Sequence, residues 1–418
     1  MTIRSRCMRL LAGFVAVCVV GGLASALPVV ADDWAQFLGP ERNGTSAEIE
    51  LADSLDDVSV AWRVPGGVGM SAVAVADGKA ITMYNEGDWQ MLVALDAQTG
   101  EEIWSVPVGA VYKNGQGDGP RATPTISGGT VYAMTGDGTL AAVSLDAGKL
   151  KWKSNAFAGG GAASEYGMSS SPLIVGSNVI VHANTASGTV VSFDAKNGDK
   201  VWAATSGAAG YSSPTLLEVG GVDQIVSFTG SAIHGIDPAG GRVLWSYPFK
   251  TPYDCNTASP INVDGGVFLS AGENHGCVLL DIKNGGGKYS VTERWSSVDT
   301  KSVLRNEWQT SVVVDGHLFG FDNVGSAGPT THLSCVRAST GETVWSETRF
   351  GKGNLTLADG KLWITTMKGE LVLAKVSPEG YQELGRKQLF ATTRQSLSIS
   401  DGKGYIRDDA EIICLKLK

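Results

Sequence analysis

Apolar residues recur along this chain in short runs that turn residues interrupt. The stretches GGTVYAMTGDGTLAAVSLDA and GSNVIVHANTASGTVVSFDA hold β-branched and apolar runs separated by Gly, Asn, Ser and Asp. Such runs are typical of β-strands, and no helical period extends across them. The 55 glycines and the low charged fraction of 18% fit this pattern, because tight turns between strands favour Gly. The pattern predicts an all-β protein.

A ten-residue motif recurs four times, as LDAQTGEEIW (95–104), FDAKNGDKVW (193–202), IDPAGGRVLW (236–245) and VRASTGETVW (336–345). Gly stands four residues after the Asp position, and Trp stands eight residues after it. Successive marking tryptophans are 42 to 50 residues apart, and Phe390 is predicted to be an eighth mark. The repeat tryptophans are Trp62, Trp104, Trp152, Trp202, Trp245, Trp295 and Trp345.

A period of this length is typical of β-propeller blades. Each interval divides into four strands, with Asp and Gly fixing the turn before the Trp strand. A four-stranded blade cannot bury both faces alone, so blades must close into a ring. The strand around Trp62 has no blade before it, and the chain after Phe390 supplies only three strands. We therefore expect an eight-bladed β-propeller of four-stranded antiparallel blades over residues 58–418, with the N-terminal strand completing the C-terminal blade.

The first 57 residues have a different character. Three arginines precede the uncharged apolar run Leu10–Leu23, and small residues follow it. This order predicts a signal peptide over residues 1–31, cleaved after Ala26 or Ala31. Residues 32–57 are expected to dock onto the propeller through Trp34 and Phe37. The protein is then exported, to the periplasm or the cell exterior, with no membrane span after cleavage.

Charge and cysteine content narrow the function further. The net charge is −9, and removal of the signal peptide makes it more negative. An acidic exported protein is a poor partner for nucleic acid. Of the four cysteines outside the signal peptide, Cys335 and Cys414 lie in apolar strand-like runs and are expected to be buried. A disulfide between Cys255 and Cys277 is compatible with an oxidising compartment, and the sequence leaves it open.

The Asp-x-x-x-Gly-x-x-x-Trp repeat resembles the tryptophan-docking motif of the pyrrolo-quinoline quinone (PQQ)-like β-propeller family. The resemblance covers about residues 59–417, and the opening DWAQFLGPERNG is similar to a group of secreted bacterial propellers in it. The outer-membrane assembly scaffold BamB is similar in architecture, as are the larger PQQ-dependent alcohol dehydrogenases. Those dehydrogenases imply PQQ and Ca²⁺ as cofactors, together with adjacent cysteines that cover the quinone. This sequence has no Cys-Cys pair, so neither cofactor is established.

In a propeller the starts of the innermost strands surround one mouth of the central channel. Basic, amide and aromatic side chains gather in these segments, and such a concave collection predicts a binding site. The predicted cofactor- or ligand-binding residues are Arg121, Tyr166, Tyr211, Asn256, Arg305, Trp308, Lys352 and Arg394. For a dehydrogenase, the resemblance implies Asp254 and Glu307 as catalytic residues, with Glu307 and Asn306 as Ca²⁺ ligands.

These observations favour a ligand-binding or protein-interaction scaffold whose site is the channel mouth. Its partner is expected to be a small molecule or an envelope protein. One alternative is a PQQ- and Ca²⁺-dependent dehydrogenase that oxidises an alcohol or a sugar. Another is a carbohydrate-binding propeller that uses its aromatic rim. The missing cysteine pair favours the scaffold, while the ligand and the oligomeric state stay open.

Overall fold

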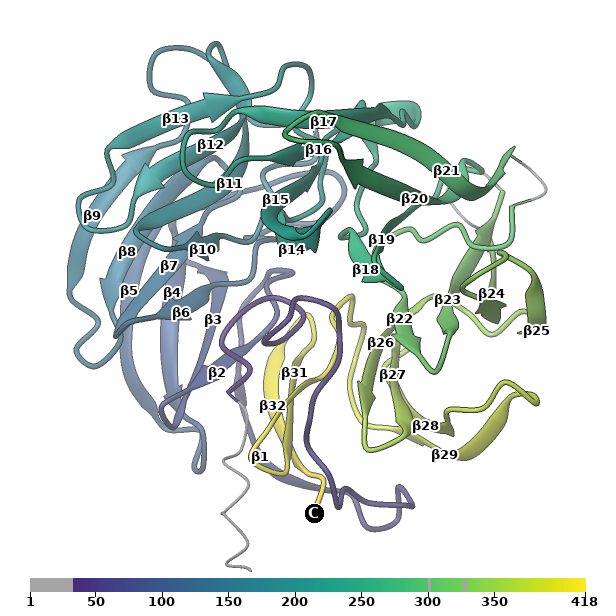
Figure 1. Ribbon diagram of the computed structural model, residues 1–418. Helices are drawn as coiled ribbons and strands as arrows, with labels where there is room; N and C mark the ends of the chain where they lie inside the picture. The colour runs from purple at the N-terminus through teal and green to yellow at the C-terminus, as the bar shows by residue number, and fades with distance from the viewer. Residues whose placement is uncertain (1–32, 300–301, 326–328) are drawn as a thin grey trace, which may run out of the picture. The chain divides into compact units, whose positions relative to one another are not determined.

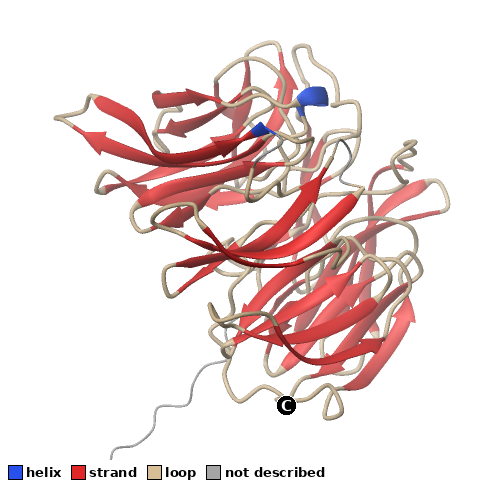
Figure 2. Cartoon of the chain, turned by 90° about the vertical axis from the view of Figure 1, so that its right-hand side faces the viewer, coloured by secondary structure: helices blue, strands red, loops and turns tan. Residues whose placement is uncertain are grey.

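The computed structural model describes residues 33–299, 302–325 and 329–418, so the predicted signal peptide lies outside the described residues. The described chain folds into eight four-stranded antiparallel sheets arranged as blades (Figure 1). Strands account for nearly all of its regular structure (Figure 2), and a 3₁₀ turn, η1, covers Pro252–Asp254. The predicted eight-bladed, all-β propeller is confirmed.

Each blade runs outward from a short innermost strand. Blade one consists of β2 (Ala74–Ala76), β3 (Lys79–Glu86), β4 (Trp89–Asp96) and β5 (Glu102–Ala110), and blade two of β6 (Thr125–Ser127), β7 (Thr130–Met134), β8 (Thr139–Ser144) and β9 (Leu150–Asn155). Blade three consists of β10 (Leu173–Val175), β11 (Asn178–Thr185), β12 (Gly188–Asp194) and β13 (Lys200–Ala204), and blade four of β14 (Thr215–Val219), β15 (Val222–Phe228), β16 (Ala232–Ile236) and β17 (Val243–Pro248). Blade five consists of β18 (Ile261–Val263), β19 (Gly266–Ala271), β20 (Gly276–Asn284) and β21 (Tyr289–Val298), and blade six of β22 (Val312–Val314), β23 (His317–Val324), β24 (Thr330–Arg337) and β25 (Thr343–Glu347). Blade seven consists of β26 (Gly353–Ala358), β27 (Lys361–Thr366), β28 (Glu370–Lys375) and β29 (Gln382–Gln388), and blade eight of β30 (Ser398–Ser400), β31 (Lys403–Arg407), β32 (Glu411–Lys416) and β1 (Ser59–Pro65).

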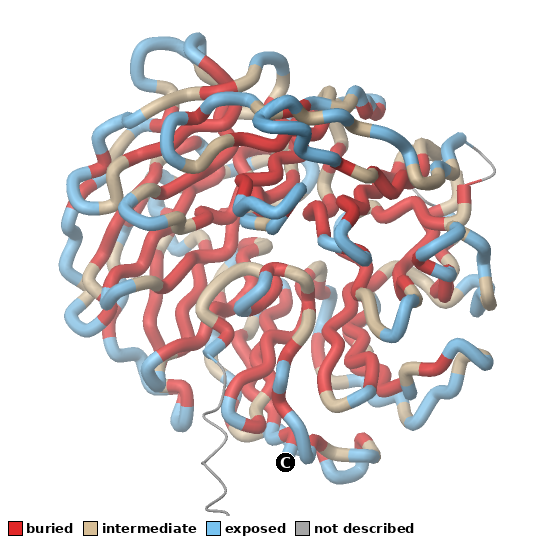
Figure 3. Tube along the Cα trace, viewed as in Figure 1, coloured by how far each residue is buried: buried red, intermediate tan, exposed pale blue. Residues whose placement is uncertain are grey.

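The ring closes through the two ends of the described chain. β1 pairs antiparallel with β32, and Trp62 lies opposite Cys414 in this register. The N-terminal strand is thus the outer strand of blade eight, as predicted. Buried residues concentrate in the inner and middle strands, while the outer edges and turns are exposed (Figure 3). The core is therefore a series of apolar layers between neighbouring blades.

Five of the seven docking tryptophans pack on a glycine in the turn of the following blade. Gly198 of blade three has φ +77°, and a Cβ built there would stand 2.5 Å from the Trp152 ring of blade two. The Trp152 indole nitrogen donates to Ala195 O at 3.0 Å in that same turn. A side chain at the glycine would displace the indole, so the spacing of Gly and Trp fixes how neighbouring blades meet. The same glycine contact occurs for Trp62, Trp104, Trp202 and Trp295.

Two tryptophans depart from this arrangement where the next turn differs. After Trp245, blade five carries a longer hairpin between β20 and β21, and the Trp245 nitrogen donates instead to Gln224 Oε1 of its own blade at 2.7 Å. Trp345 donates to Ser377 O at 2.9 Å and packs beside Tyr381, with ring centroids 6.2 Å apart. The interface between blades therefore adapts to each turn.

The prediction that Phe390 is the eighth docking aromatic is wrong. In the register of blade seven, Gly385 occupies the place that Trp345 occupies in blade six. The N-terminal segment supplies the missing bulk, because Leu55 Cγ lies 3.3 Å from where a Cβ at Gly385 would stand. Phe390 follows β29 and is buried against blade eight. A residue distant in sequence thus fills the gap that the repeat leaves empty.

Residues 33–57, here called the N-terminal strap, contact innermost strands on both sides of the ring. Trp34 is 2% exposed and bridges Val75 of β2. The Arg42 guanidinium, also 2% exposed, donates to Ser171 O just ahead of β10. Thr45 then bridges β26 of blade seven. Because these strands surround the propeller axis, the strap crosses the axis and fills that part of the channel with its side chains.

Hydroxyl groups join the innermost strands below the mouth. The Thr123 amide donates to Ser171 Oγ, and the Ser171 amide donates to Ser213 Oγ, both at 2.9 Å. Deeper in the blades, the His182 Nε2 and Ser227 Oγ atoms lie 2.6 Å apart. The Ser171 and Ser213 hydroxyls are therefore structural links between successive blades, which accounts for these two Ser-Pro segments without a nucleophilic role.

We expect two buried histidines to make the fold sensitive to acid. Burial lowers the pKa of His182 to about 3 and that of His234 to about 4, from an ordinary 6.5. Both rings are neutral in the folded state, so their contribution to stability is present above pH 6.5 and is lost as pH falls through the folded values. Below pH 6.5 each group changes the free energy of unfolding by about 1.4 kcal/mol per pH unit.

The double variant His182→Gln, His234→Gln should therefore show a flatter dependence of unfolding free energy on pH between 6.5 and 4 than the wild type. Denaturant titrations at several pH values measure this. Parallel wild-type and double-variant profiles would contradict the expectation.

Candidate functional site

Arg121 lies in the loop between β5 and β6, and its guanidinium group forms its hydrogen bonds within the protein. Its Nε donates to Tyr166 O at 2.5 Å, and its two terminal nitrogens donate to Gly117 O at 2.7 Å and to Gly119 O. The guanidinium carbon lies 4.7 Å from the centroid of the Tyr112 ring. Burial lowers the pKa of Arg121. The predicted anion-binding arginine is thus a bracket that holds two mouth loops together.

Two of the predicted aromatic residues meet next to this bracket. The Tyr166 and Tyr211 rings are stacked, with centroids 5.5 Å apart and planes inclined by 28°. The Tyr166 amide donates to the Tyr211 hydroxyl at 3.3 Å. Burial raises the pKa of Tyr211 to about 12, so the hydroxyl keeps its proton at neutral pH. The pair therefore presents a neutral, partly covered aromatic surface.

A second group, here called the Trp308 cluster, comprises Glu307, Trp308, Lys352 and Arg394. Lys352 Nζ lies 2.6 Å from Glu307 Oε2 and 4.5 Å from the Trp308 ring centroid. The Arg394 guanidinium carbon lies 5.2 Å from the same centroid, and Trp308 stays 38% exposed. Burial raises the pKa of Glu307, while Lys352 opposes that rise. The cluster places an exposed indole beside two cations, a favourable cation–π arrangement.

The glycine-rich run 115–119 connects the two groups. Arg394 donates to Gln116 O at 2.8 Å and lies 3.5 Å from Met70 Sδ, while Gln395 Nε2 donates to Met70 O. The residues predicted from sequence to bind a ligand did not include Tyr112, Met70 or Gln116, although Met70 lies in one of the predicted mouth segments. The concentration of glycine in this loop was the available signal, because it allows the main chain to approach two arginines closely.

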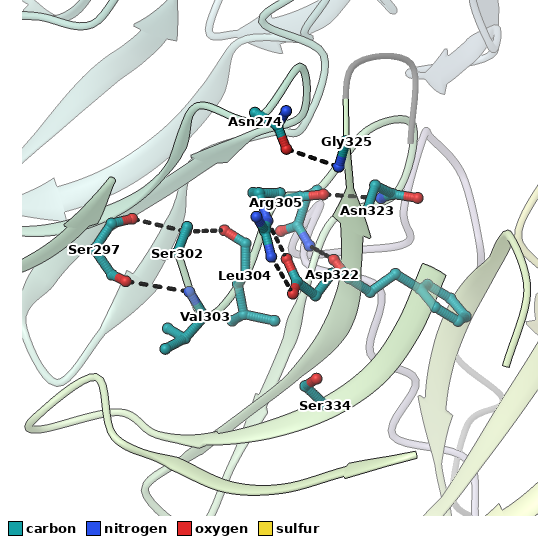
Figure 4. A network of polar contacts seen from close by, with 12 residues as sticks. Asn274, Ser297, Ser302, Val303, Leu304, Arg305, Asp322, Asn323, Gly325 and Ser334 are labelled. Carbon is teal, nitrogen blue, oxygen red and sulfur yellow. Dashed lines mark hydrogen bonds and ion pairs between the residues drawn. The ribbon is translucent and has the colours of Figure 1, made fainter. Parts of the chain in front are cut away.

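Arg305 lies inside blade six rather than at the open mouth. Its Nε and one terminal nitrogen donate to the two Asp322 carboxylate oxygens, each at 2.6 Å (Figure 4). The two side chains are only 4% and 9% exposed. Asn323 Nδ2 also donates to Arg305 O at 2.8 Å. This bidentate pair is part of the fold's interior.

The two predicted asparagines are also buried and engaged by the protein. Asn256 Nδ2 donates to Thr229 O at 2.7 Å, and its amide oxygen accepts from Thr251 Oγ1 at 3.0 Å. Asn306 Nδ2 donates to Phe321 O at 2.9 Å, and its amide oxygen accepts from Ser311 Oγ at 2.9 Å. Both residues act as ties between their loops and neighbouring strands.

Asp254 lies on η1, in a projecting loop of blade five. Tyr253 and Asp254 both adopt positive φ angles, of 57° and 53°, and Tyr253 is 64% exposed. Cys255 and Cys277 are free thiols, and burial raises the pKa of each to about 12. The disulfide that the sequence left open is not formed. The ion pair and the cation–π contacts that define the Trp308 cluster do not include Asp254.

No cluster of three or more His, Cys, Asp or Glu side chains suited to a metal ion occurs within the described ranges. Across the same part of the chain, none of the helical segments has the length and apolarity needed to cross a bilayer. At the mouth, Arg121, Lys352 and Arg394 thus contact other groups of the protein, and the Trp308 indole stays exposed among them.

Comparison with known proteins places this geometry in context. A family model described as outer membrane protein assembly factor BamB matches residues 53–206 and 88–347. BamB of Burkholderia pseudomallei is 25% identical over 214 residues, which cover 49% of this chain and 50% of that protein. The quinone alcohol dehydrogenase subunit of Komagataeibacter europaeus is 34% identical over 139 residues, covering 31% of this chain and 18% of that protein. The crystal structure of the Comamonas testosteroni quinohemoprotein alcohol dehydrogenase has a TM-score of 0.69 at 14% identity, covering 92% of this chain and 80% of that one.

The BamB match spans about half the length of the relative, and the dehydrogenase match spans less. The structural likeness shows the propeller fold. The two matches together cover residues 53–347, which is well over half of the chain and includes all seven docking tryptophans. The chain therefore belongs to the family of PQQ-like repeat propellers described as outer membrane protein assembly factor BamB.

Proposed function

We propose that this protein is an exported, non-catalytic scaffold that binds a protein of the cell envelope through the Trp308 cluster. The proposal depends on one observation: Trp308 is exposed next to Lys352 and Arg394, while its polar neighbours are bonded within the protein. Tryptophan and arginine are the residues most enriched at the energetic centres of protein interfaces. The name of the BamB relatives, outer membrane protein assembly factor, supports an envelope partner.

The quinone dehydrogenase alternative needs basic groups for carboxylates and oxygen ligands for a cation. The residues expected for these tasks do not fit. Arg121 donates to main-chain carbonyls, and Arg305 is paired with Asp322. Glu307 is paired with Lys352, and the Asn306 amide oxygen accepts from a serine. Binding a quinone and a cation here would require breaking these contacts, so we derive no reaction step through either group.

The carbohydrate alternative has less support than the scaffold. Sugar binding by an aromatic rim needs an open ring face, and two cations already lie over the Trp308 ring. A cationic and aromatic surface is better suited to an acidic or aromatic protein segment. The protein-interaction role therefore explains both the exposed indole and the charges that surround it.

Replacing Trp308 with Ala should weaken the affinity for the envelope partner at least about 30-fold. This is the effect of losing an interface residue that contributes about 2 kcal/mol or more to the free energy of binding. The measurement is quantitative affinity purification from the organism's own envelope fraction, followed by titration of the recovered partner. Trp89→Ala is the matched control, because Trp89 is 52% exposed at the start of β4 and lies outside the cluster. Equal recovery with Trp308→Ala would contradict the proposal. So would dye reduction after addition of PQQ and Ca²⁺ that is lost on Asp254→Asn or Glu307→Gln.

A further inference from the structure

A cavity of about 640 Å³ opens between blades six and seven. Three loops surround it: the end of the β23–β24 connection, the β25–β26 connection and the β27–β28 turn. Its volume is in the range of small-molecule sites. Its lining residues are Pro329, Thr330, Thr331, Arg349, Phe350, Gly351, Lys352, Thr366, Met367, Lys368 and Glu370. Lys352 is the one member that it shares with the Trp308 cluster.

The loops that form the cavity are tied to one another. The Gly351 amide donates to Thr331 O at 3.3 Å, and the Met367 amide donates to Lys352 O at 2.9 Å. The Glu370 amide donates to Thr366 Oγ1 at 3.1 Å, which fixes the β27–β28 turn. These bonds run from blade six to blade seven and across the turn, so the cavity walls are held by main-chain contacts rather than by side chains alone.

The lining carries an excess of positive charge within an acidic protein. Lys352 is neutralised by Glu307, and Glu370 accepts from Arg386 at 3.0 Å, so these two lining charges are already compensated. Arg349 and Lys368 remain, and neither side chain forms an ion pair with any residue that the structure describes. Both are exposed at the cavity edge. Two cations that face the same cavity repel each other unless an anion lies between them.

The rest of the wall is suited to an organic frame. Phe350 is half-buried and fixed by neighbouring rings, with centroids 5.7 Å from Phe321 and 5.7 Å from Tyr381. Arg386 lies over the same ring at 5.2 Å. Met367 and Pro329 add apolar surface. A small inorganic anion would leave this surface uncovered, whereas a ring or short carbon chain would cover it.

The main chain at Arg349 is fixed by the surrounding structure. It adopts a φ of 59°, a conformation that non-glycine residues rarely adopt, and its amide donates to His332 Nδ1 at 2.9 Å. Backbone strain of this kind persists when the surroundings fix it, and it is frequent at ligand-binding positions. Guanidinium groups bind carboxylates through two parallel hydrogen bonds, which an ammonium group cannot match.

We propose that this inter-blade cavity binds a small organic anion with two or more carboxylates on an apolar frame, with Arg349 and Lys368 as its charge partners. Phe350 and Met367 contact the frame. The site shares Lys352 with the Trp308 cluster, but its proposed charge partners Arg349 and Lys368 lie outside that cluster. Neither the sequence repeat nor the comparison with the dehydrogenases leads to this cavity, because it lies between two blades rather than at the shared channel.

The test is isothermal titration calorimetry of the full chain at low ionic strength, with benzene-1,3,5-tricarboxylate, citrate and inorganic phosphate as probes. We expect the aromatic tricarboxylate to bind most tightly and phosphate most weakly. The double variant Arg349→Gln, Lys368→Gln should weaken tricarboxylate binding by about tenfold or more, since both charge-assisted contacts are lost. Trp308→Ala should leave it unchanged, which separates this proposal from the proposed function.

The matched control is Arg242→Gln, Lys283→Gln, which removes the same charges from exposed positions in blades four and five. Thermal unfolding of every variant checks the fold. The proposal is overturned if the tricarboxylate does not bind, if the control pair weakens it equally, or if phosphate binds as tightly. It is also overturned if a short acidic peptide binds at the cavity residues while the small tricarboxylate does not.

Discussion

Replacing Arg305 with Ala is expected to lower the free energy of unfolding by about 3–5 kcal/mol. Both guanidinium–carboxylate contacts are 2.6 Å long, and the Arg305 and Asp322 side chains are 4% and 9% exposed. Removing the arginine leaves a buried carboxylate without its charge partner, and the interior cannot solvate it. Equilibrium unfolding in urea, followed by tryptophan fluorescence, measures the change.

A second arginine–aspartate pair provides the control. Arg294 and Asp281 also meet at 2.6 Å, but their side chains are 25% and 34% exposed, so Arg294→Ala should change the unfolding free energy by at most about 1 kcal/mol. Replacing both members of the buried pair, as Arg305→Met with Asp322→Leu, should recover much of the lost stability. Similar losses for Arg305→Ala and Arg294→Ala would show that burial does not govern the pair.

Replacing Trp152 with Ala should lower the free energy of unfolding by a similar amount, about 3–5 kcal/mol. The indole is 8% exposed, packs on Gly198 and donates to Ala195 O of the next blade. Its loss leaves a cavity at the interface between two blades and removes a hydrogen bond. Thermal and urea unfolding of the full chain measure the effect.

Gly198→Ala tests the same contact from the other side. The glycine has φ +77°, and the new Cβ would stand 2.5 Å from Trp152 Cε3, so this smaller change should also destabilise the fold. The control is Trp89→Ala, where a 52% exposed indole is removed and stability should change little. If Trp89→Ala and Trp152→Ala had equal effects, the indole–turn contact would not be the source of stability between blades.

The repeat predicted the architecture because its period and its turn chemistry are local. Asp and Gly specify the turn, and the regular interval of Trp counts the blades. The prediction failed at Phe390, where an aromatic residue stands near the expected interval but the blade holds Gly385. The compensating residue, Leu55, is more than 300 positions away, and no local pattern indicates that the two positions meet.

The candidate site was predictable in outline only. Sequence placed the mouth segments ahead of the inner strands, and Glu307, Trp308, Lys352 and Arg394 do come together. It did not reveal which polar side chains the protein uses internally, because such partners lie on other strands. Arg305 and Asp322 are 17 residues apart, on a loop and a strand whose pairing only the folded blade establishes. The loop residue Arg349 lacked any repeated signature.

The pairing of β1 with β32 has a consequence for how the molecule is made. A ribosome releases β1 before every other strand of the propeller, yet its hydrogen-bonding partner β32 is the last of these strands to be synthesised. Every intermediate stage therefore carries one unpaired edge at each end of a growing arc, and such edges are prone to association with other chains. Loss of residues 411–416 would remove β32 and leave β1 without its neighbour. Truncation ahead of β32 should thus be as harmful to the closed ring as a defect in β1.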